Sequence, residues 1–298
     1  MTAAPALVGA AEAALGVPVV GARAVAGGAL NDAWRLELDD GRAVFVKTAA
    51  DAPAGGYAAE AAGLRWLAEP AALATPEVLA VVDGAGARVR LLTLEWIEPG
   101  RLDRSGEEEL GRGLAALHAA GAPAFGDFSR GRVAQPLRIG PLELPNGPAT
   151  SWPDFYAEQR LLPLTRMAAE RDTLPEGAAA SIDRLCARLP ELAGPPEPPA
   201  RLHGDLWSGN VMADSAGRPY LIDPAAYGGH REVDLAMLRL FGGPSERCFS
   251  AYAEVVPLAD GHAERVALWQ LFPLLVHAFL FGGGYGDSVA RIARRYVG

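Results

Sequence analysis

RLHGDLWSGNVMADSAGRPYLIDPA, residues 201–225, is the most informative segment of this 298-residue chain. Its first part indicates a tight loop from His203 to Asn210. Its second part indicates a hairpin with the strands VMA and PYLI around the turn DSAGR. Asp205 and Asn210 are five residues apart on the loop, and Asp223 follows the second strand. Because the hairpin folds back on itself, we expect Asp223 to lie beside Asn210.

Two carboxylates and an amide oxygen in one place form an oxygen-rich site that suits Mg²⁺. Phosphoryl transfer requires such a site: one Asp orients and deprotonates the accepting hydroxyl, and an Asn and a second Asp hold the metal. In kinases a Lys, held by a Glu on a helix, also grips the nucleotide phosphates. Asp and Asn are common turn formers as well, so a purely structural role is the alternative.

Lys47 is the only lysine in the chain, because the other 26 of the 27 basic residues are arginines. The segments AWRLEL and AVFVK alternate in polarity around the turn DDG, which predicts a β-hairpin with Lys47 facing away from Val44 and Val46. A compact ammonium and a planar guanidinium do not fit the same tight phosphate site. Lys47 is therefore either a phosphate ligand or the last lysine left by random drift to arginine.

The segment YAAEAAGLRWLAE, residues 57–69, predicts a helix on which Glu60, Leu64 and Leu67 share one face. An acid on an apolar face is unfavourable unless it is paired. Lys47 is the expected partner, and the alternative is that Glu60 lies in water at the edge of the face. The Lys, the helix Glu, the loop Asp and Asn and the later Asp occur in the order that a kinase site requires.

The chain changes in character after its first hundred residues. The first part is mostly strand, and LLTLEWIEPG ends it with a strand and a Pro-Gly link. From Ser105 onward the chain is helical, and SGEE is a capping-box pattern. We expect His118, near the end of this helix, to be a packed or helix-terminal histidine rather than a catalyst. Residues 121–150 are rich in Pro and Gly and predict a long loop that shapes a binding pocket.

Composition limits the classes of partner. The net charge of −9 argues against nucleic acid and anionic membranes, since both need a basic surface. Cys186 and Cys248 are far apart and suit reduced thiols in the cytoplasm. The N-terminus has no Lys or Arg before its apolar run, so the secretory signal pattern is missing. Polar residues interrupt the apolar stretch from Val266 to Gly286, so we expect a buried helix rather than a membrane span.

The motif LHGDLWSGN, residues 202–210, is more specific than the HGD and later Asn shared by aminoglycoside and choline kinases, because a Leu-Trp pair separates the two. It resembles the motif of the fructosamine kinases, also called ketosamine 3-kinases. Further segments resemble the same family: GGALNDAWRL, FVK, EAAGLRWL, LEWI, LGRGLAALH, FYAEQRLLP, DPAAYGGHREVDLAMLRLFGG and LFGGGYGD. The resemblance covers nearly the whole chain. It implies an α+β, protein-kinase-like fold with an N-lobe of antiparallel strands and one helix, residues 1–98, and a mainly helical C-lobe, residues 99–298.

The resemblance also implies roles for individual residues. Asp205 matches the catalytic base, and Asn210 and Asp223 match the ligands of Mg²⁺. Lys47 and Glu60 match the ion pair that grips the phosphates of ATP.

Other positions match the rest of the nucleotide site. Gly27, Gly28 and Asn31 belong to a loop that resembles the cover over the phosphates. Glu95 and Ile97 match the hinge between the lobes, whose backbone would bind adenine.

Three further residues lie in or near the catalytic loop. His203 resembles the histidine that braces this loop, and Asp234 is a second candidate brace, although an acid near a helix N-terminus also has a purely structural explanation. Trp207 either packs in the core or offers an aromatic face to a sugar.

The implied activity is phosphorylation by Mg-ATP of the sugar 3-hydroxyl of a ketosamine, an amine condensed with a sugar and rearranged. One alternative is a small-molecule kinase of the aminoglycoside or choline type, since a fold does not fix a substrate. A second is a nucleotide-binding pseudokinase, which we would expect to have lost at least one of Lys47, Asp205, Asn210 and Asp223. The sequence leaves the oligomeric state and the preferred sugar and amine open.

Overall fold

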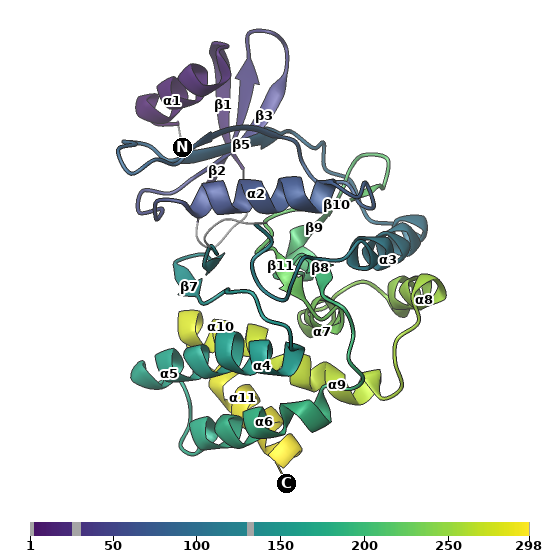
Figure 1. The fold of residues 1–298 in the computed structure, drawn as a ribbon. Coiled ribbons are helices and arrows are strands. Elements are labelled where there is room, and N and C mark those ends of the chain that lie inside the picture. The colour runs from purple at the N-terminus through teal and green to yellow at the C-terminus, as the bar shows by residue number, and fades with distance from the viewer. Residues whose placement is uncertain (1–2, 26–30, 130–133, 298) are drawn as a thin grey trace.

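The computed structural model describes residues 3–25, 31–129 and 134–297. Figure 1 shows a strand-rich part that contains the N-terminus and a helical part that ends with the C-terminus. The first part consists of α1 (Pro5–Leu15), β1 (Val19–Val25), β2 (Asp32–Leu38), β3 (Ala43–Thr48), α2 (Gly56–Ala68), β4 (Val78–Val82) and β5 (Leu91–Glu95). Its five strands form an antiparallel sheet in the order β1-β2-β3-β5-β4.

The two faces of this sheet are covered by different helices. Alternate residues of β2 and β3, among them Leu36 and Val44, are buried in a cluster with Leu7 of α1. Leu92 and Leu94 of β5 point to the opposite face and pack against α2. The hairpin and the helix predicted from residues 33–69 are therefore confirmed. The side chains alternate along each strand because successive residues point to opposite faces of the sheet, and a different helix covers each face.

In its described residues the second part is mainly helical, with three short two-stranded sheets. Its first elements are α3 (Arg104–Ala119), β6 (Leu137–Ile139), β7 (Leu142–Leu144), α4 (Trp152–Tyr156), the π-helical turn η1 (Ala157–Leu161), α5 (Leu162–Glu170) and α6 (Ala178–Leu192). The strands β8 (Ala200–Leu202), β9 (Val211–Ala213), β10 (Pro219–Leu221) and β11 (Tyr227–Gly229) follow, with the 3₁₀ turn η2 (Ser208–Asn210) before β9. The chain ends with α7 (Glu232–Leu240), α8 (Glu246–Val255), α9 (His262–Trp269), α10 (Leu271–Phe281) and α11 (Tyr285–Val297). The α+β class is confirmed.

Two local predictions are wrong. Asp103, and not Ser105, caps α3: its carboxylate accepts a hydrogen bond of 2.8 Å from the Gly106 N–H. A carboxylate at the N-cap position satisfies a free backbone N–H as a serine would, so the two residues compete for the same role. Residues 121–150 are also not one long loop, because the β6–β7 hairpin lies within them.

The apolar stretch near the C-terminus forms α9 and α10. The helical stretch His262–Phe281 is long and apolar enough to cross a membrane by those two measures, but most of it is buried within the protein. Trp269 and Leu275 are among its residues in the largest hydrophobic cluster. The apolar composition of this segment is therefore explained by core packing, as predicted.

The β9–β10 hairpin joins the two parts of the molecule. The Leu221 N–H donates to the Ala74 carbonyl at 2.9 Å, just after α2, and the Gly100 N–H donates to the Ala213 carbonyl at 2.8 Å, just after β5. A Cβ at position 100 would lie 1.9 Å from the Asp214 carbonyl oxygen, so only glycine permits this close contact. The hairpin, and with it Asp223, is thus fixed against the strand-rich part.

Candidate active site

The loop between β8 and β9 holds an aspartate and an asparagine in direct contact. The Asn210 side chain donates from Nδ2 to the Asp205 carbonyl oxygen at 2.8 Å and to the Asp205 carboxylate at 3.0 Å. The loop needs glycine at Gly204, where φ is +82° and a Cβ would lie 2.0 Å from the Ala225 carbonyl oxygen. The amide nitrogen of Asn210 is therefore committed to Asp205, which leaves its oxygen, Oδ1, as the group that can meet a cation.

His203 and Asp234 hold the start of this loop. The Asp234 carboxylate accepts hydrogen bonds from the His203 N–H at 2.7 Å and the Gly204 N–H at 2.9 Å. The His203 ring donates from Nε2 to the Ile222 carbonyl at 2.9 Å, and its Nδ1 accepts from the Asp205 N–H at 3.3 Å. This pattern requires a neutral imidazole, and burial lowers the pKa of His203 accordingly.

Asp223 lies beside the loop in an unusual backbone conformation. The Ile222 N–H donates to the Asn210 carbonyl at 3.1 Å, which brings the end of β10 next to Asn210 as expected. Asp223 has a φ of +54°, a left-handed value that is uncommon outside glycine and that concentrates at functional sites. Its Oδ1 lies 3.0 Å from Lys47 Nζ, across the boundary between the strand-rich and helical parts.

Lys47 also contacts α2. Its Nζ donates to Glu60 at 2.9 Å, so the pairing predicted from the sequence is present. Burial alone would lower the pKa of Lys47, but the carboxylates of Glu60 and Asp223 outweigh it and raise this pKa above its ordinary value. Burial raises the pKa of Glu60, and the nearby Lys47 opposes that shift. The 2.9 Å contact and the raised pKa of Lys47 are those of an ion pair with the proton on the lysine.

Helix α2 is fixed to the helical part at its C-terminal end. Arg201 of β8 donates to the Trp66 carbonyl and to Glu69, and its guanidinium lies 4.5 Å from the centre of the Trp66 ring. Trp66 stacks on Phe128 with ring centres 4.3 Å apart. At Gly63 an added Cβ would lie only 3.2 Å from the Ala226 side chain. These contacts set the distance of Glu60 from the loop of residues 203–210.

The structure describes three of the five other residues expected to bind the nucleotide. The Asn31 side-chain oxygen accepts a hydrogen bond of 2.9 Å from the Tyr57 hydroxyl of α2. Glu95 ends β5, and Ile97 follows in the segment that leads to the helical part, half-buried. Gly27 and Gly28 lie outside the described residues.

Trp207 is not a core residue. Its side chain is 39% exposed, two positions after Asp205, and it meets Phe241 edge to face with ring centres 6.4 Å apart. The ring also covers Gly209, where a Cβ would lie 2.3 Å from it. Of the two predicted roles, packing in the core is therefore wrong.

The residues fit a divalent cation. Around Lys47 lie the carboxylates of Glu60 and Asp223, and Asp205 is close enough to Asp223 for the two charges to interact. The pKa of Asp205 is raised to about 6, because burial and the charge of Asp223 raise it more than the Asn210 hydrogen bond lowers it. The carboxylates outnumber the single ammonium, and Asn210, in contact with Asp205, adds an amide oxygen, so the residues supply the oxygen donors that Mg²⁺ prefers.

Sequence reasoning missed two supporting residues. Arg201 could not be found from the sequence, because an arginine on a three-residue strand gives no sign of a partner 135 positions away. The sequence predicts His118 to be a packed or helix-terminal residue, but its Nε2 also lies 3.3 Å from Asp234. Its position on the apolar face of α3, beside Leu114 and Leu117, was the available signal, since a buried histidine needs polar partners.

The antiparallel sheet, the helical second part and the polar groups that meet between them define a protein-kinase-like phosphotransferase. The chain belongs to the fructosamine kinase family, whose model matches residues 7–297.

Individual relatives agree with this family. A protein of Synechocystis sp. named a probable ketoamine kinase is 35% identical, over 92% of this chain and 89% of its own length. The ketosamine-3-kinase of Mus musculus is 33% identical, over 90% of this chain and 92% of its own length. A crystal structure from Thermobifida fusca, assigned as a fructosamine-3-kinase, is 41% identical, covers 99% of both chains and has a TM-score of 0.89.

More distant structures share the fold alone. The macrolide 2′-phosphotransferase of Brachybacterium faecium is 18% identical over 97% of this chain and 96% of its own, with a TM-score of 0.61.

Proposed function

We propose that the protein transfers a phosphoryl group from Mg-ATP to the 3-hydroxyl of a ketosamine sugar. One observation carries the proposal: the single lysine of the chain lies 2.9 Å from a helix glutamate and 3.0 Å from Asp223. A phosphate grip of this kind serves phosphoryl transfer. Membership of the fructosamine kinase family, and the name of the mouse ketosamine-3-kinase, support the substrate class.

Asp205 acts as the base in this proposal. Its carboxylate orients the sugar hydroxyl and accepts its proton as the new O–P bond forms. Burial keeps its pKa near the working pH, at about 6, where a carboxylate is a more effective base than an exposed one. Asn210 and Asp223 would hold Mg²⁺, which neutralises the charge that develops on the phosphates.

The remaining residues position the two substrates. Lys47, held by Glu60, grips the α- and β-phosphates, and the segment of Gly27, Gly28 and Asn31 covers them. The backbone at Glu95 and Ile97 binds adenine.

The exposed face of Trp207 stacks on the sugar. Residues 1–98 and 99–298 act as the two lobes, with this site between them, and the partner is a small molecule rather than a nucleic acid or a membrane. The two free cysteines suit a cytoplasmic enzyme.

The test is ADP release from Mg-ATP with fructose-lysine, ribulose-lysine and an aminoglycoside. We expect release with the ketosamines, and ³¹P NMR should place one phosphomonoester on the oxygen at sugar C3. Release with the aminoglycoside alone would favour a kinase of that type instead. ATP binding without release on any acceptor would favour a pseudokinase.

A further inference from the structure

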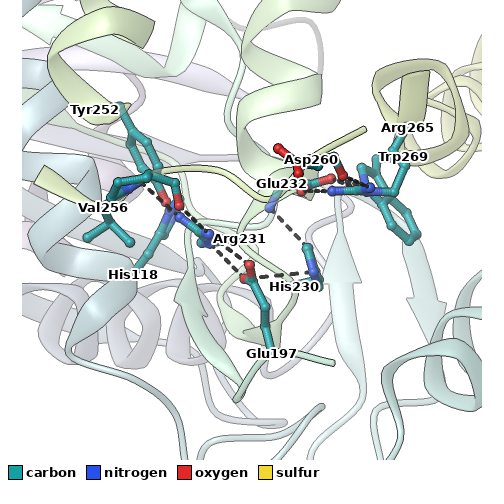
Figure 2. Close-up of polar contacts among 11 residues, drawn as sticks. His118, Glu197, His230, Arg231, Glu232, Tyr252, Val256, Asp260, Arg265 and Trp269 are labelled. Atoms are coloured by element: carbon teal, nitrogen blue, oxygen red, sulfur yellow. Dashed lines mark hydrogen bonds and ion pairs between the residues drawn. The ribbon is translucent and has the colours of Figure 1, made fainter. Parts of the chain in front are cut away.

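The start of α7 carries a run of buried polar residues, of which only Asp234 belongs to the site described above. His230, Arg231, Glu232 and Asp234 are all buried. Figure 2 shows polar partners of the first three from other parts of the chain: Glu197 for His230 and Arg231, and Arg265 for Glu232. Buried charges are unfavourable unless they are paired, so such a run requires an explanation. Asp234 is the member that contacts the catalytic loop.

His118 of α3 is a further partner of Asp234. Its Nε2 lies 3.3 Å from Asp234 Oδ2, the same oxygen that accepts the His203 N–H. The other oxygen of Asp234 accepts the Gly204 N–H. The orientation of the Asp234 carboxylate toward the loop therefore depends on its contact with His118.

Tyr252 of α8 fixes the ring of His118. Its hydroxyl lies 2.9 Å from His118 Nδ1, and the two rings meet edge to face with centres 5.6 Å apart. Burial raises the pKa of Tyr252, so its hydroxyl keeps its proton and can donate it to Nδ1. His118 Nε2 then carries the ring N–H that points to Asp234.

We propose that His118, oriented by Tyr252, is a positioning residue for phosphoryl transfer, acting through Asp234 on the backbone that carries Asp205. This inference rests on the role proposed for Asp205. His118 does not reach the substrate. Through Asp234 it fixes the position of the His203–Gly204 backbone, which leads directly to Asp205. A small displacement of a catalytic group is enough to slow a reaction strongly.

A second pair on the same helix provides a matched control. Glu232 accepts hydrogen bonds from Arg265 at 2.6 and 2.9 Å and from the Trp269 indole at 2.8 Å. This pair is buried like His118 and Asp234, and Figure 2 shows it on the other side of the α7 start, directed away from His118. A change here should lower stability without moving the catalytic loop.

The kinetic test compares four variants under saturating Mg-ATP and fructose-lysine. His118→Phe should lower kcat by about 10- to 100-fold, the usual range for residues that orient a catalytic group, with the KM for ATP changed less than about threefold. His118→Gln, which restores an N–H near the Nε2 position, should recover most of this loss. Tyr252→Phe should cost about two- to tenfold, as expected for one hydrogen bond. Glu232→Gln should keep the wild-type kcat.

Amide hydrogen exchange gives a readout that does not require activity. The N–H groups of His203 and Gly204 should exchange faster in His118→Phe and Tyr252→Phe than in Glu232→Gln or the wild type. The inference would be overturned if Tyr252→Phe and His118→Phe kept the exchange rates and the kcat of the wild type. It would also be overturned if Glu232→Gln lost as much kcat as His118→Phe. If His118→Phe does not fold, Tyr252→Phe and His118→Gln carry the same test. If the wild type itself releases no ADP, the proposed function fails, and the exchange experiment still decides whether His118 positions the loop.

Discussion

Two buried charge groups in this protein are built in opposite ways. Around Lys47, one ammonium faces the carboxylates of Glu60 and Asp223, Asp223 is 40% exposed, and Glu60 Oε1 has no hydrogen-bond partner within the described ranges. Around Glu232, both carboxylate oxygens are bonded by Arg265, and a tryptophan N–H adds a third bond. The first group has more negative than positive charge, whereas in the second the charges are equal and both carboxylate oxygens are hydrogen-bonded.

This difference indicates that the group around Lys47 binds ligands, whereas the group around Glu232 stabilises the fold. A balanced, fully bonded pair gains nothing from a ligand and contributes through the fold, because removing one partner leaves a charge buried. A group with excess carboxylate can accept a cation and keep its lysine for a phosphate. Variants of the first group should therefore change activity more than stability, and variants of the second should do the reverse.

The largest effect is expected for Asp205→Asn. Loss of a positioned base typically costs about 10²- to 10⁴-fold in rate, while the affinity for ATP should change little, because Asp205 is assigned to the acceptor. ADP release and calorimetric ATP binding measure the two quantities. Asp51→Asn, at an exposed position, is the control. If Asp205→Asn kept the wild-type rate, Asp205 would not be the catalytic base.

Arg265→Met should have the largest effect on stability. It leaves Glu232 buried without its cation, which typically costs about 3–5 kcal/mol in the free energy of unfolding. The kcat of the molecules that remain folded should equal that of the wild type. Urea denaturation and activity at low temperature test both points. An activity loss without a loss of stability would show that the two groups do not differ as described.

Lys47→Arg tests whether the site needs an ammonium rather than any positive charge. A guanidinium is too wide for the same position, so kcat/KM should fall by about 10²-fold, the scale of one lost electrostatic contact to the reacting phosphates. Arg42→Lys, exposed on the same hairpin, should behave as the wild type. If Lys47→Arg keeps full activity, the solitary lysine has no special role.

The smallest effect concerns pH. Burial lowers the pKa of His230 below its ordinary 6.5; Glu232 and Glu197 oppose this shift, and Arg231 and Arg265 add to it. Below about pH 6.5 the unfolded chain therefore binds a proton at His230 that the folded chain excludes, so this residue lowers the free energy of unfolding as the pH falls. His230→Asn should lose less stability than the wild type between pH 7.5 and 5.5 in urea titrations. Parallel pH profiles would contradict this sign.

The parts of the site that are local in sequence could be predicted. Lys47 and Glu60 are thirteen residues apart, and strand alternation and helix spacing place Glu60 on a buried face where Lys47 is the expected partner. The same holds for Asp205 and Asn210 on one loop, and for Asp223 at the end of the hairpin that follows.

Long-range contacts could not be predicted. The contact between His118 and Asp234 joins residues 116 positions apart, and that between Arg201 and Trp66 joins residues 135 positions apart. Neither pair repeats a spacing that a helix or strand imposes. A run of charged residues such as 230–234 is usually a solvated helix start, and only the packing of α3, α8 and α9 around it makes it buried.

Calorimetric titration of ATP, with Mg²⁺ and with excess EDTA, tests most directly whether the group around Lys47 binds a metal and a nucleotide. The wild type should bind ATP more tightly with Mg²⁺, and Asp223→Ala should lose most of that difference while Glu232→Gln keeps it. Equal affinity with and without Mg²⁺ in the wild type, or no ATP binding at all, would contradict the account.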